Sequence, residues 1–230
     1  MEDPGEDSHV GLIETDLAIH TEAGETIAAT LTLPDEDGGR KRPAVLLCQG
    51  LSGIRTAVLP ELARIFAGQG LASLRFDYLG CGDSEGEPGW VDPVSRSRQA
   101  ALALAWLIAR NDIDSTKVGV YGHSYGGQTA ISVAARDRRV GAVVAVSSPG
   151  SGSDLLRASR AGWDWIEFRQ KLDEERAAVA GGSEPRMVGV DELLPFSPAF
   201  MEKWLKLTSG GDGTSSMKSG SELPRYFLLS

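Results

Sequence analysis

The 230-residue sequence predicts an α/β protein in which a mostly parallel sheet is covered by helices on both faces. Short apolar runs without polar alternation recur along the first 150 residues, which is typical of strands buried on both faces. Stretches with helical periodicity separate these runs. A strand–helix–strand order predicts parallel strands joined by right-handed crossovers, with ligands bound beyond the carboxyl ends of the strands.

The expected elements follow in a regular order. Residues 11–21 and 26–33 alternate like the two arms of a hairpin. Buried strands are then expected at 43–48, 71–78, 117–121 and 140–146, and helices at 56–67, 92–111 and 125–136. On the second of these helices, the inner side is expected to consist of Leu102, Ala105, Trp106 and Ile108.

The pattern changes after Ser147. A disordered acidic lead (1–9) and an α/β core (10–152) are followed by an expected cap-like insertion, residues 153–222. This insertion is helical over 153–180 and includes a flexible Gly/Ser-rich segment, residues 209–221. Residues 223–230 are interpreted either as the start of a late core strand or as part of the insertion.

Composition excludes several classes of function. The net charge is −9, and an acidic chain repels phosphate backbones, so we expect no nucleic-acid partner. Neither a secretory signal nor a membrane span is recognisable, which predicts a cytoplasmic protein without a membrane partner. Cys48 and Cys81 lack metal-ligand spacing and are interpreted as free thiols; we expect no cofactor and no metal.

Residues 122–126, Gly-His-Ser-Tyr-Gly, match the G-x-S-x-G pattern of a nucleophile elbow. An elbow needs a buried strand before the serine and a helix directly after it, and Ser124 has both. The flanking glycines remove Cβ atoms that would collide in the sharp turn. We therefore predict that Ser124 is a nucleophile; the alternative is a serine that only caps the following helix.

Ser84 competes for this role, because residues 82–86 read Gly-Asp-Ser-Glu-Gly. It lies in a loop rather than between a strand and a helix. Asp83 and Glu85 flank it, and their negative charge opposes an alkoxide or an oxyanion. Context therefore favours Ser124 over Ser84.

A serine nucleophile needs an oxyanion hole. One donor is expected to be the backbone N–H of Tyr125, the residue after the serine. The other is expected from the turn after the first buried strand, where Gln49 and Gly50 precede Leu51, whose N–H would point at the same oxygen. The alternative is an ordinary strand-to-helix turn.

Three motifs together resemble the α/β-hydrolase superfamily. They are the oxyanion turn at Gln49-Gly50-Leu51, the loop Arg75–Gly86, which is similar to F-D-Y-R-G-x-G-x-S, and the Ser124 elbow. The sequence most resembles dienelactone-hydrolase-like and serine-aminopeptidase-like (S33/S15 type) hydrolases. The resemblance implies an α/β-hydrolase fold, a serine mechanism, and a structural rather than catalytic Ser84. Three positions depart from the family pattern: Gln49 replaces the usual His, Leu79 the usual Arg, and Cys81 a frequent His.

The catalytic triad is incomplete in this sequence. The family order is Ser, then Asp or Glu, then His, yet His9, His20 and His123 all precede Ser124. The best remaining candidate for the acid is Asp154, and the weaker candidates are Asp77, Asp191 and Glu192. We therefore expect a truncated hydrolase whose isolated chain is poorly soluble and nearly inactive.

Two functions remain open from the sequence. The first is a serine hydrolase that cleaves an ester, thioester or amide of a small-molecule acyl substrate through an acyl-Ser124 intermediate. In such a hydrolase, the aromatic residues of the cap-like insertion would either line an apolar acyl pocket or only pack the cap helices onto the sheet. These residues are Trp163, Trp165, Phe168, Phe200 and Trp204. The second is a non-catalytic relative that binds a ligand or a partner. The sequence leaves the oligomeric state open.

Overall fold

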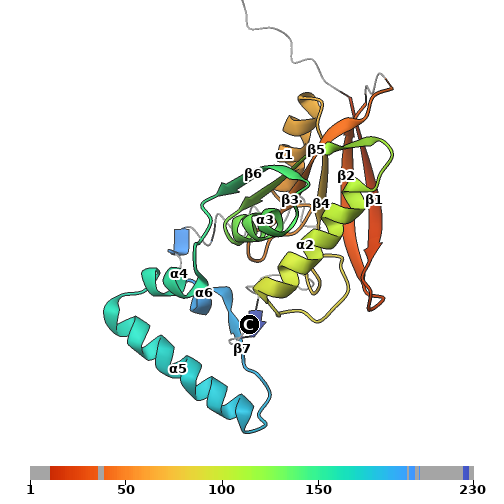
Figure 1. The fold of residues 1–230 in the computed structure, drawn as a ribbon. Helices are drawn as coiled ribbons and strands as arrows, with labels where there is room; N and C mark the ends of the chain where they lie inside the picture. The colour runs from red at the N-terminus through yellow and green to blue at the C-terminus, as the bar shows by residue number, and fades with distance from the viewer. Residues whose placement is uncertain (1–10, 36–38, 196, 200–201, 203–224, 228–230) are drawn as a thin grey trace, which may run out of the picture.

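The computed structural model describes residues 11–35, 39–195, 197–199, 202 and 225–227. The expected lead (1–9) and the Gly/Ser-rich segment (209–221) lie outside these residues. The core is a six-stranded sheet in the order β1-β2-β4-β3-β5-β6 (Figure 1). Its strands are β1 (Leu12–His20), β2 (Thr26–Pro34), β3 (Arg42–Cys48), β4 (Ala72–Phe76), β5 (Ile113–His123) and β6 (Val140–Val146).

The sheet is parallel except at one edge. β4, β3, β5 and β6 run parallel to one another, whereas β1 pairs antiparallel with β2, and β2 antiparallel with β4. This confirms the predicted hairpin and the mostly parallel sheet. The carboxyl ends of β3, β4 and β5 consequently meet at one edge of the sheet, where a ligand site is expected.

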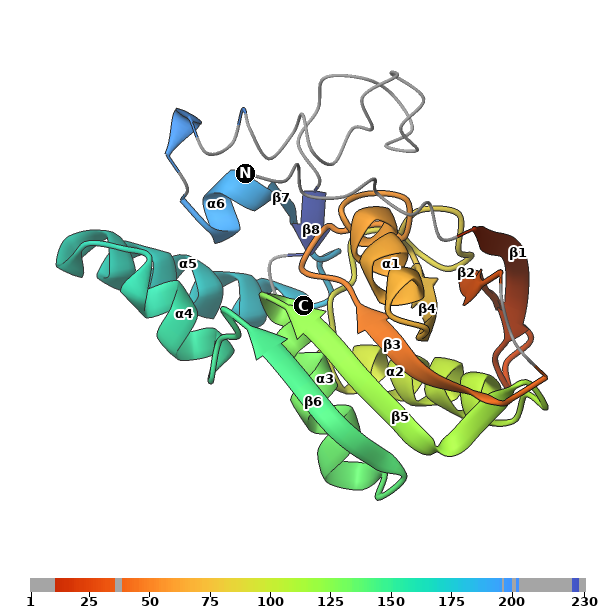
Figure 2. The ribbon, with the colours of Figure 1, turned by 90° about the horizontal axis from the view of Figure 1, so that it is seen from above.

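Helices cover the centre of the sheet on both faces (Figure 2). α1 (Leu59–Gly68) packs with Leu47 of β3, whereas the neighbouring Leu46 belongs to the core cluster shared with α2 (Pro93–Ile108) and α3 (Tyr125–Arg136). Successive side chains of a strand point to opposite faces, so β3 needs apolar residues at both parities. Its non-alternating run Ala-Val-Leu-Leu-Cys supplies them.

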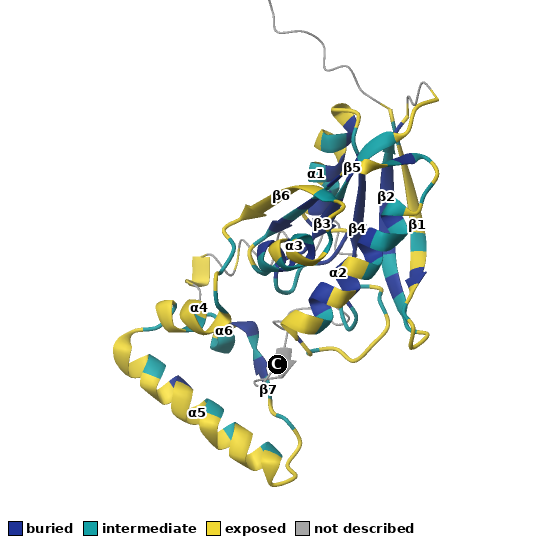
Figure 3. Ribbon diagram, in the orientation of Figure 1, coloured by how far each residue is buried: buried dark blue, intermediate teal, exposed yellow. Residues whose placement is uncertain are grey.

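The prediction that Val140–Val146 is a fourth buried strand is wrong. β6 is the last strand of the sheet, and its residues 141–146 are exposed (Figure 3). Val144, for example, keeps 52% of its surface accessible. The apolar run correctly indicates a strand of a parallel sheet. Burial of that strand also requires a neighbouring strand on each side and covering helices. α3 packs against β6, but among the described residues no strand pairs with its outer edge.

The segment after β6 forms a cap beside the carboxyl ends of the strands (Figure 1). The single helical stretch predicted over 153–180 is two helices, α4 (Gly152–Ala158) and α5 (Gly162–Ala180), separated by residues 159–161. The short strand β7 (Met187–Gly189) and helix α6 (Val190–Leu193) follow. β8 (Arg225–Phe227) pairs antiparallel with β7, which favours the insertion interpretation of residues 223–230 over a late core strand.

Arg160 ties the cap together. Its guanidinium lies 3.7 Å above the ring of Phe168 and donates hydrogen bonds to the carbonyls of Glu192 and Leu193 at the end of α6.

Within the described part of the chain, no helix is long and apolar enough to cross a bilayer.

Candidate active site

Ser124 lies at the turn between β5 and α3, in a conformation that non-glycine residues rarely adopt. Its φ is 52° and its ψ is −127°. The turn is held by two backbone hydrogen bonds, from Ser124 N–H to the Val146 carbonyl (2.8 Å) and from Gly127 N–H to the Ser124 carbonyl (3.0 Å). The Ser124 side chain is exposed and makes no capping hydrogen bond to α3. A strained, exposed serine that does not cap its helix contradicts the capping-serine alternative.

The glycines on either side of Ser124 are required by close backbone contacts. A Cβ at Gly122 would collide with the backbone of Gly126. One at Gly126 would collide with the carbonyl oxygens of Cys48 and Gln49. The first turn of α3 is therefore pressed against the end of β3, which brings the elbow next to the predicted oxyanion turn.

The oxyanion turn is a tight reversal of the chain. Gly53 N–H donates to the Gly50 carbonyl at 3.4 Å, and Ser52 takes a positive φ of 63°. Within the described residues, the Leu51 N–H donates no hydrogen bond. The Tyr125 N–H, at the first position of α3, has no acceptor within its own helix. Leu51 and Tyr125 line the same cavity, so the structure brings the two predicted donor residues together.

Arg96 of α2 is a residue of this site that sequence reasoning missed. It is only 4% exposed, and its Nη2 donates to the carbonyls of Gln49 (3.1 Å) and Gly50 (3.0 Å). The guanidinium also lies 3.7 Å from the ring centre of Tyr78 and 5.1 Å from that of Tyr125.

The prediction of which face of α2 points into the core is wrong, and for this reason the sequence did not single out Arg96. Leu102, Ala105, Trp106 and Ile108 are only partly buried; the buried stripe includes Arg96, Ala100, Ala103 and Leu107. Ala100, Ala103 and Leu107 follow Arg96 at helical spacing. An arginine on the same helical stripe as small and apolar residues was the signal in the sequence that could have indicated a buried Arg96.

Gln49, which occupies the position of the family's usual histidine, is buried at 1% exposure. Its side chain lies over Gly53, where a Cβ would come within 2.7 Å of Oε1. Among the described residues, Nε2 of Gln49 finds no hydrogen-bond partner. The substitution therefore keeps the turn packed but leaves one buried donor unused.

Asp77 and Arg55 fasten the oxyanion loop to the loop after β4. Asp77 is fully buried and accepts hydrogen bonds from the backbone N–H of Arg55 (2.6 Å), from its Nη1 (2.7 Å) and from the backbone N–H of Asp83 (3.1 Å). Burial raises the pKa of the Asp77 carboxyl, and these hydrogen bonds oppose the rise. Asp77, one of the weaker candidates for the triad acid, thus has a structural role.

Ser84 is a structural serine, as the resemblance implied. Its Oγ donates to the Asp77 carbonyl at 2.7 Å and accepts from the Ala28 backbone N–H at 2.9 Å. The first bond closes the loop onto Asp77, the residue directly after β4, and the second anchors the loop to β2. The hydroxyl is fully engaged, in contrast to that of Ser124.

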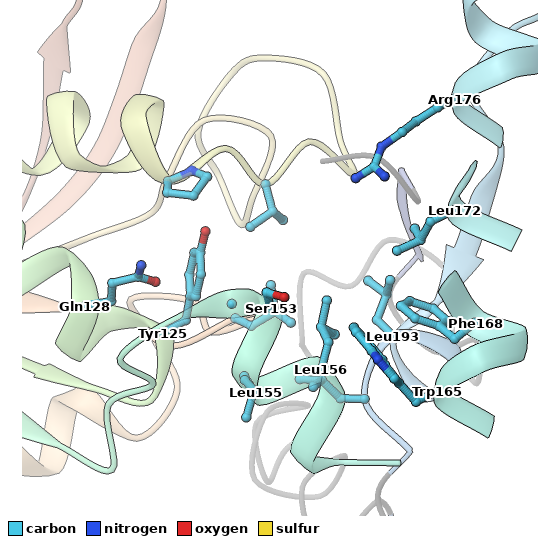
Figure 4. A pocket seen from close by; sticks show the side chains of 15 residues that line it. Tyr125, Gln128, Ser153, Leu155, Leu156, Trp165, Phe168, Leu172, Arg176 and Leu193 are labelled. Carbon is cyan, nitrogen blue, oxygen red and sulfur yellow. The ribbon is translucent and has the colours of Figure 1, made fainter. Parts of the chain in front are cut away.

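A cavity of about 370 Å³ lies between the core and the cap (Figure 4). On the core side it is bounded by Leu51, Tyr125 and Gln128, and on the cap side mainly by apolar side chains from α4, α5 and the end of α6. The apolar cap residues are Leu155, Leu156, Trp165, Phe168, Leu172, Leu193 and Leu194. Such a cavity suits an apolar group held next to the elbow.

The cap aromatics divide between the two alternatives left open by the sequence. Trp165 and Phe168 line the cavity and also belong to the cap's own apolar cluster. Trp163 is 78% exposed and does neither. Phe200 and Trp204 lie outside the described residues.

Among the described residues, none of the candidates for the triad acid or base is hydrogen-bonded to Ser124. His20 is exposed on the edge strand β1, and the His123 ring packs beside Gly50, where burial lowers its pKa. His9 lies outside the described residues. Asp154 is exposed in the first turn of α4, and Glu192 pairs with Arg186 at 3.3 Å. The side chain of Asp191, the remaining candidate, lies over Gly189 in the cap.

The two cysteines are free thiols. Burial raises the pKa of Cys48 to about 12 and also raises the pKa of Cys81, which disfavours the reactive thiolate in both. No group of three or more His, Cys, Asp or Glu side chains that could hold a metal occurs in the described ranges.

Comparisons with known proteins agree with this geometry. Residues 23–181 match the family model of the X-Pro dipeptidyl-peptidase (S15 family). An uncharacterised 31.7 kDa protein from the traX–finO intergenic region of Escherichia coli is 32% identical over 181 residues, which are 78% of this chain and 63% of that protein. The chain thus spans less than two thirds of this relative's length.

Two further similarities lead to proteins that are described as hydrolases. The thiohydrolase aneE from Aspergillus aculeatus is 33% identical over 110 residues, 47% of this chain and 35% of that protein. The α/β hydrolase GrgF from Penicillium sp. sh18 has a TM-score of 0.69 and 22% sequence identity, over 94% of this chain and 70% of that one. This structural likeness shows the fold.

Proposed function

Because the chain belongs to the X-Pro dipeptidyl-peptidase (S15) family of α/β hydrolases, we propose that it is a serine hydrolase that acts through an acyl-Ser124 intermediate. The observation that carries the proposal is the Ser124 turn, which has φ 52° and a side chain that makes no capping bond. Backbone strain of this kind persists where the surrounding structure holds a reactive group in place.

In the proposed reaction, the Oγ of Ser124 attacks the carbonyl carbon of an ester, thioester or amide. The Oγ–C bond forms, the bond to the leaving group breaks, and the leaving alcohol, thiol or amine takes up a proton. The Leu51 and Tyr125 N–H groups would stabilise the negative charge on the carbonyl oxygen, each typically worth about 3 kcal/mol. Water then hydrolyses the acyl-serine to the free acid.

The substrate we propose is a small molecule with an apolar acyl group. The cavity beside Leu51 and Tyr125 is walled by leucines and by Trp165 and Phe168 of the cap, which would hold such a group near Ser124. A thiohydrolase and several polyketide transferases among the relatives favour a thioester or an ester over a peptide.

One observation favours a second candidate, a non-catalytic protein that binds a small ligand in the same cavity. None of the three histidines in the sequence follows Ser124, and among the described residues no histidine is hydrogen-bonded to its hydroxyl. A serine without a base reacts slowly, whereas the cavity would bind apolar ligands in either case.

A fluorophosphonate probe separates the two candidates. We expect one adduct per chain after prolonged incubation with excess probe, measured by intact-protein mass spectrometry. The Ser84→Ala variant should be labelled like the parent chain, and Ser124→Ala should not be labelled. Absence of an adduct on the folded parent chain, or an adduct that persists in Ser124→Ala, would overturn the hydrolase proposal.

A further inference from the structure

Arg96 is a buried cation that has no carboxylate partner among the described residues. Only 4% of its surface is exposed, and among the described residues no carboxylate lies within ion-pair distance of it. Burying an arginine without a carboxylate is costly unless its donors are used in another way. Its Nη2 donates instead to two consecutive main-chain carbonyls, those of Gln49 and Gly50.

The Gly50 carbonyl belongs to the same peptide unit as the Leu51 N–H. This peptide bond is trans, and in a trans peptide the C=O and N–H groups point in opposite directions. A donor that holds the Gly50 oxygen at 3.0 Å therefore also sets the direction of the Leu51 N–H. The Gln49 carbonyl, held at 3.1 Å, fixes the preceding peptide plane in the same way.

We propose that Arg96 is the positioning residue of the oxyanion hole: it orients the Leu51 N–H and links the turn at Gly50 to the start of α3. This inference rests on the proposed function of Ser124. The link to α3 is the guanidinium itself, which lies 5.1 Å from the ring centre of Tyr125 while it stacks at 3.7 Å on Tyr78. One side chain thus contacts Gly50, whose peptide unit includes the Leu51 N–H, and the ring of Tyr125, whose backbone carries the other expected donor.

The charge of Arg96 has a second effect on the turn. A cation that donates to the Gly50 carbonyl polarises the whole peptide unit, and hydrogen bonds along such a chain strengthen one another. The Leu51 N–H on the far side of the unit becomes a stronger donor. Gly53 N–H donates to the same carbonyl at 3.4 Å and adds to this polarisation.

The test compares Arg96→Met and Arg96→Lys with a matched control, Arg98→Met. Arg98 lies on the same helix two residues later and is exposed. The measured quantity is the rate constant for labelling of Ser124 by a small fluorophosphonate at 10 °C. In this reaction the Oγ–P bond forms, fluoride leaves, the serine proton passes to solvent, and the phosphoryl oxygen occupies the oxyanion position.

We expect Arg96→Met to lower the labelling rate by about 100-fold, because removal of one oxyanion donor has an effect of this order. Arg96→Lys should lie between Arg96→Met and the parent chain, since an ammonium reaches the carbonyls without the planar fork. Arg98→Met should leave the rate unchanged. Hydrogen exchange of the Leu51 amide, followed by NMR, should change in Arg96→Met and not in Arg98→Met.

A merely structural role gives a different pattern: the melting temperature falls, while the folded Arg96→Met protein labels at the parental rate. That result would overturn the inference. If Arg96→Met does not fold, the same criterion applies to Arg96→Lys: a parental labelling rate in the folded variant overturns the inference, and a lowered rate supports it.

Failure of the proposed function is recognised separately, because the fluorophosphonate would then not label Ser124 of the parent chain either. In that case a crystal structure of Arg96→Met decides. A reoriented Gly50–Leu51 peptide supports the positioning role, and an unchanged peptide contradicts it.

Discussion

Asp77 accepts two hydrogen bonds from Arg55, one from its backbone N–H at 2.6 Å and one from its guanidinium at 2.7 Å. The pair joins two loops that are far apart in the sequence, the one after β3 and the one after β4. Asp83, which is more than half exposed, adds an outer carboxylate 2.6 Å from the same guanidinium. The position of the oxyanion turn therefore depends on a buried ion pair outside it.

The first prediction concerns this pair. Asp77→Asn keeps the shape of the side chain but leaves the Arg55 charge with only the exposed Asp83, and we expect a loss of about 3 kcal/mol in the free energy of unfolding. The matched control is Asp137→Asn, which removes a pair with the half-exposed Arg139 and should cost about 0.5 kcal/mol. Urea unfolding followed by fluorescence measures both; equal losses would contradict the structural role of Asp77.

The second prediction concerns the contact between the elbow and β3. Gly126→Ala introduces a Cβ against the carbonyls of Cys48 and Gln49, and we expect it to destabilise the protein by about 2 kcal/mol through overpacking. It should also lower fluorophosphonate labelling, because the turn is displaced.

The control for this variant is Gly162→Ala at the start of α5, where a Cβ has nothing within 4 Å. Its stability should be unchanged or raised by up to about 1 kcal/mol, since Ala favours helix more than Gly. Thermal unfolding that ranks Gly126→Ala as the more stable variant would show that the close approach is not rigid.

The third prediction concerns the exposed edge strand β6. Val144 is 52% exposed on β6, whose outer edge pairs with no strand among the described residues, and an unpaired edge is a template for association between chains. We expect Val144→Lys to reduce aggregation at high concentration, measured by light scattering, with a stability change within about 0.5 kcal/mol. Val120→Lys, on the buried strand β5, should instead unfold the protein. Unchanged aggregation of Val144→Lys would mean that another surface drives association.

The sequence predicted most of the core, because each core element carries its own local signal. The helix Tyr125–Arg136 and the strand Val140–Val146 have the predicted bounds. Burial was predicted less well, since it depends on what lies beside an element. The valines of β6 have the same composition as a central strand, and only the absence of a neighbour among the described residues exposes them.

In the candidate site too, residues with a local sequence signal were predicted, and a residue that depends on a long-range contact was not. Ser124 stood out because its pattern, strand and helix are contiguous, and Ser84 was separated from it by local charge and loop context. Arg96 depends on a contact between α2 and a loop 46 residues away, at Gly50. No local pattern encodes such a contact, and a shift of the assumed inner face of α2 was enough to hide it.

The fourth prediction concerns the cavity. Leu172→Trp should partly fill it, so we expect acylation of Ser124 by p-nitrophenyl octanoate to fall about tenfold while acylation by p-nitrophenyl acetate is unchanged. Trp163→Ala, outside the cavity, should affect neither ester. Equal effects of Leu172→Trp on both esters would place the acyl group elsewhere.

The most direct test of the central claim is the detection of the acyl-enzyme itself. We expect the chain, incubated with p-nitrophenyl octanoate and quenched in acid, to gain one octanoyl group. Peptide mass spectrometry should place this group on Ser124. The adduct should accumulate, because none of the three histidines follows Ser124 in the order of the catalytic triad, in which the histidine activates water for deacylation. Octanoyl on Ser124, absent from Ser124→Ala, is the predicted result; an unmodified Ser124 in folded protein, or octanoyl on another residue alone, would contradict the account.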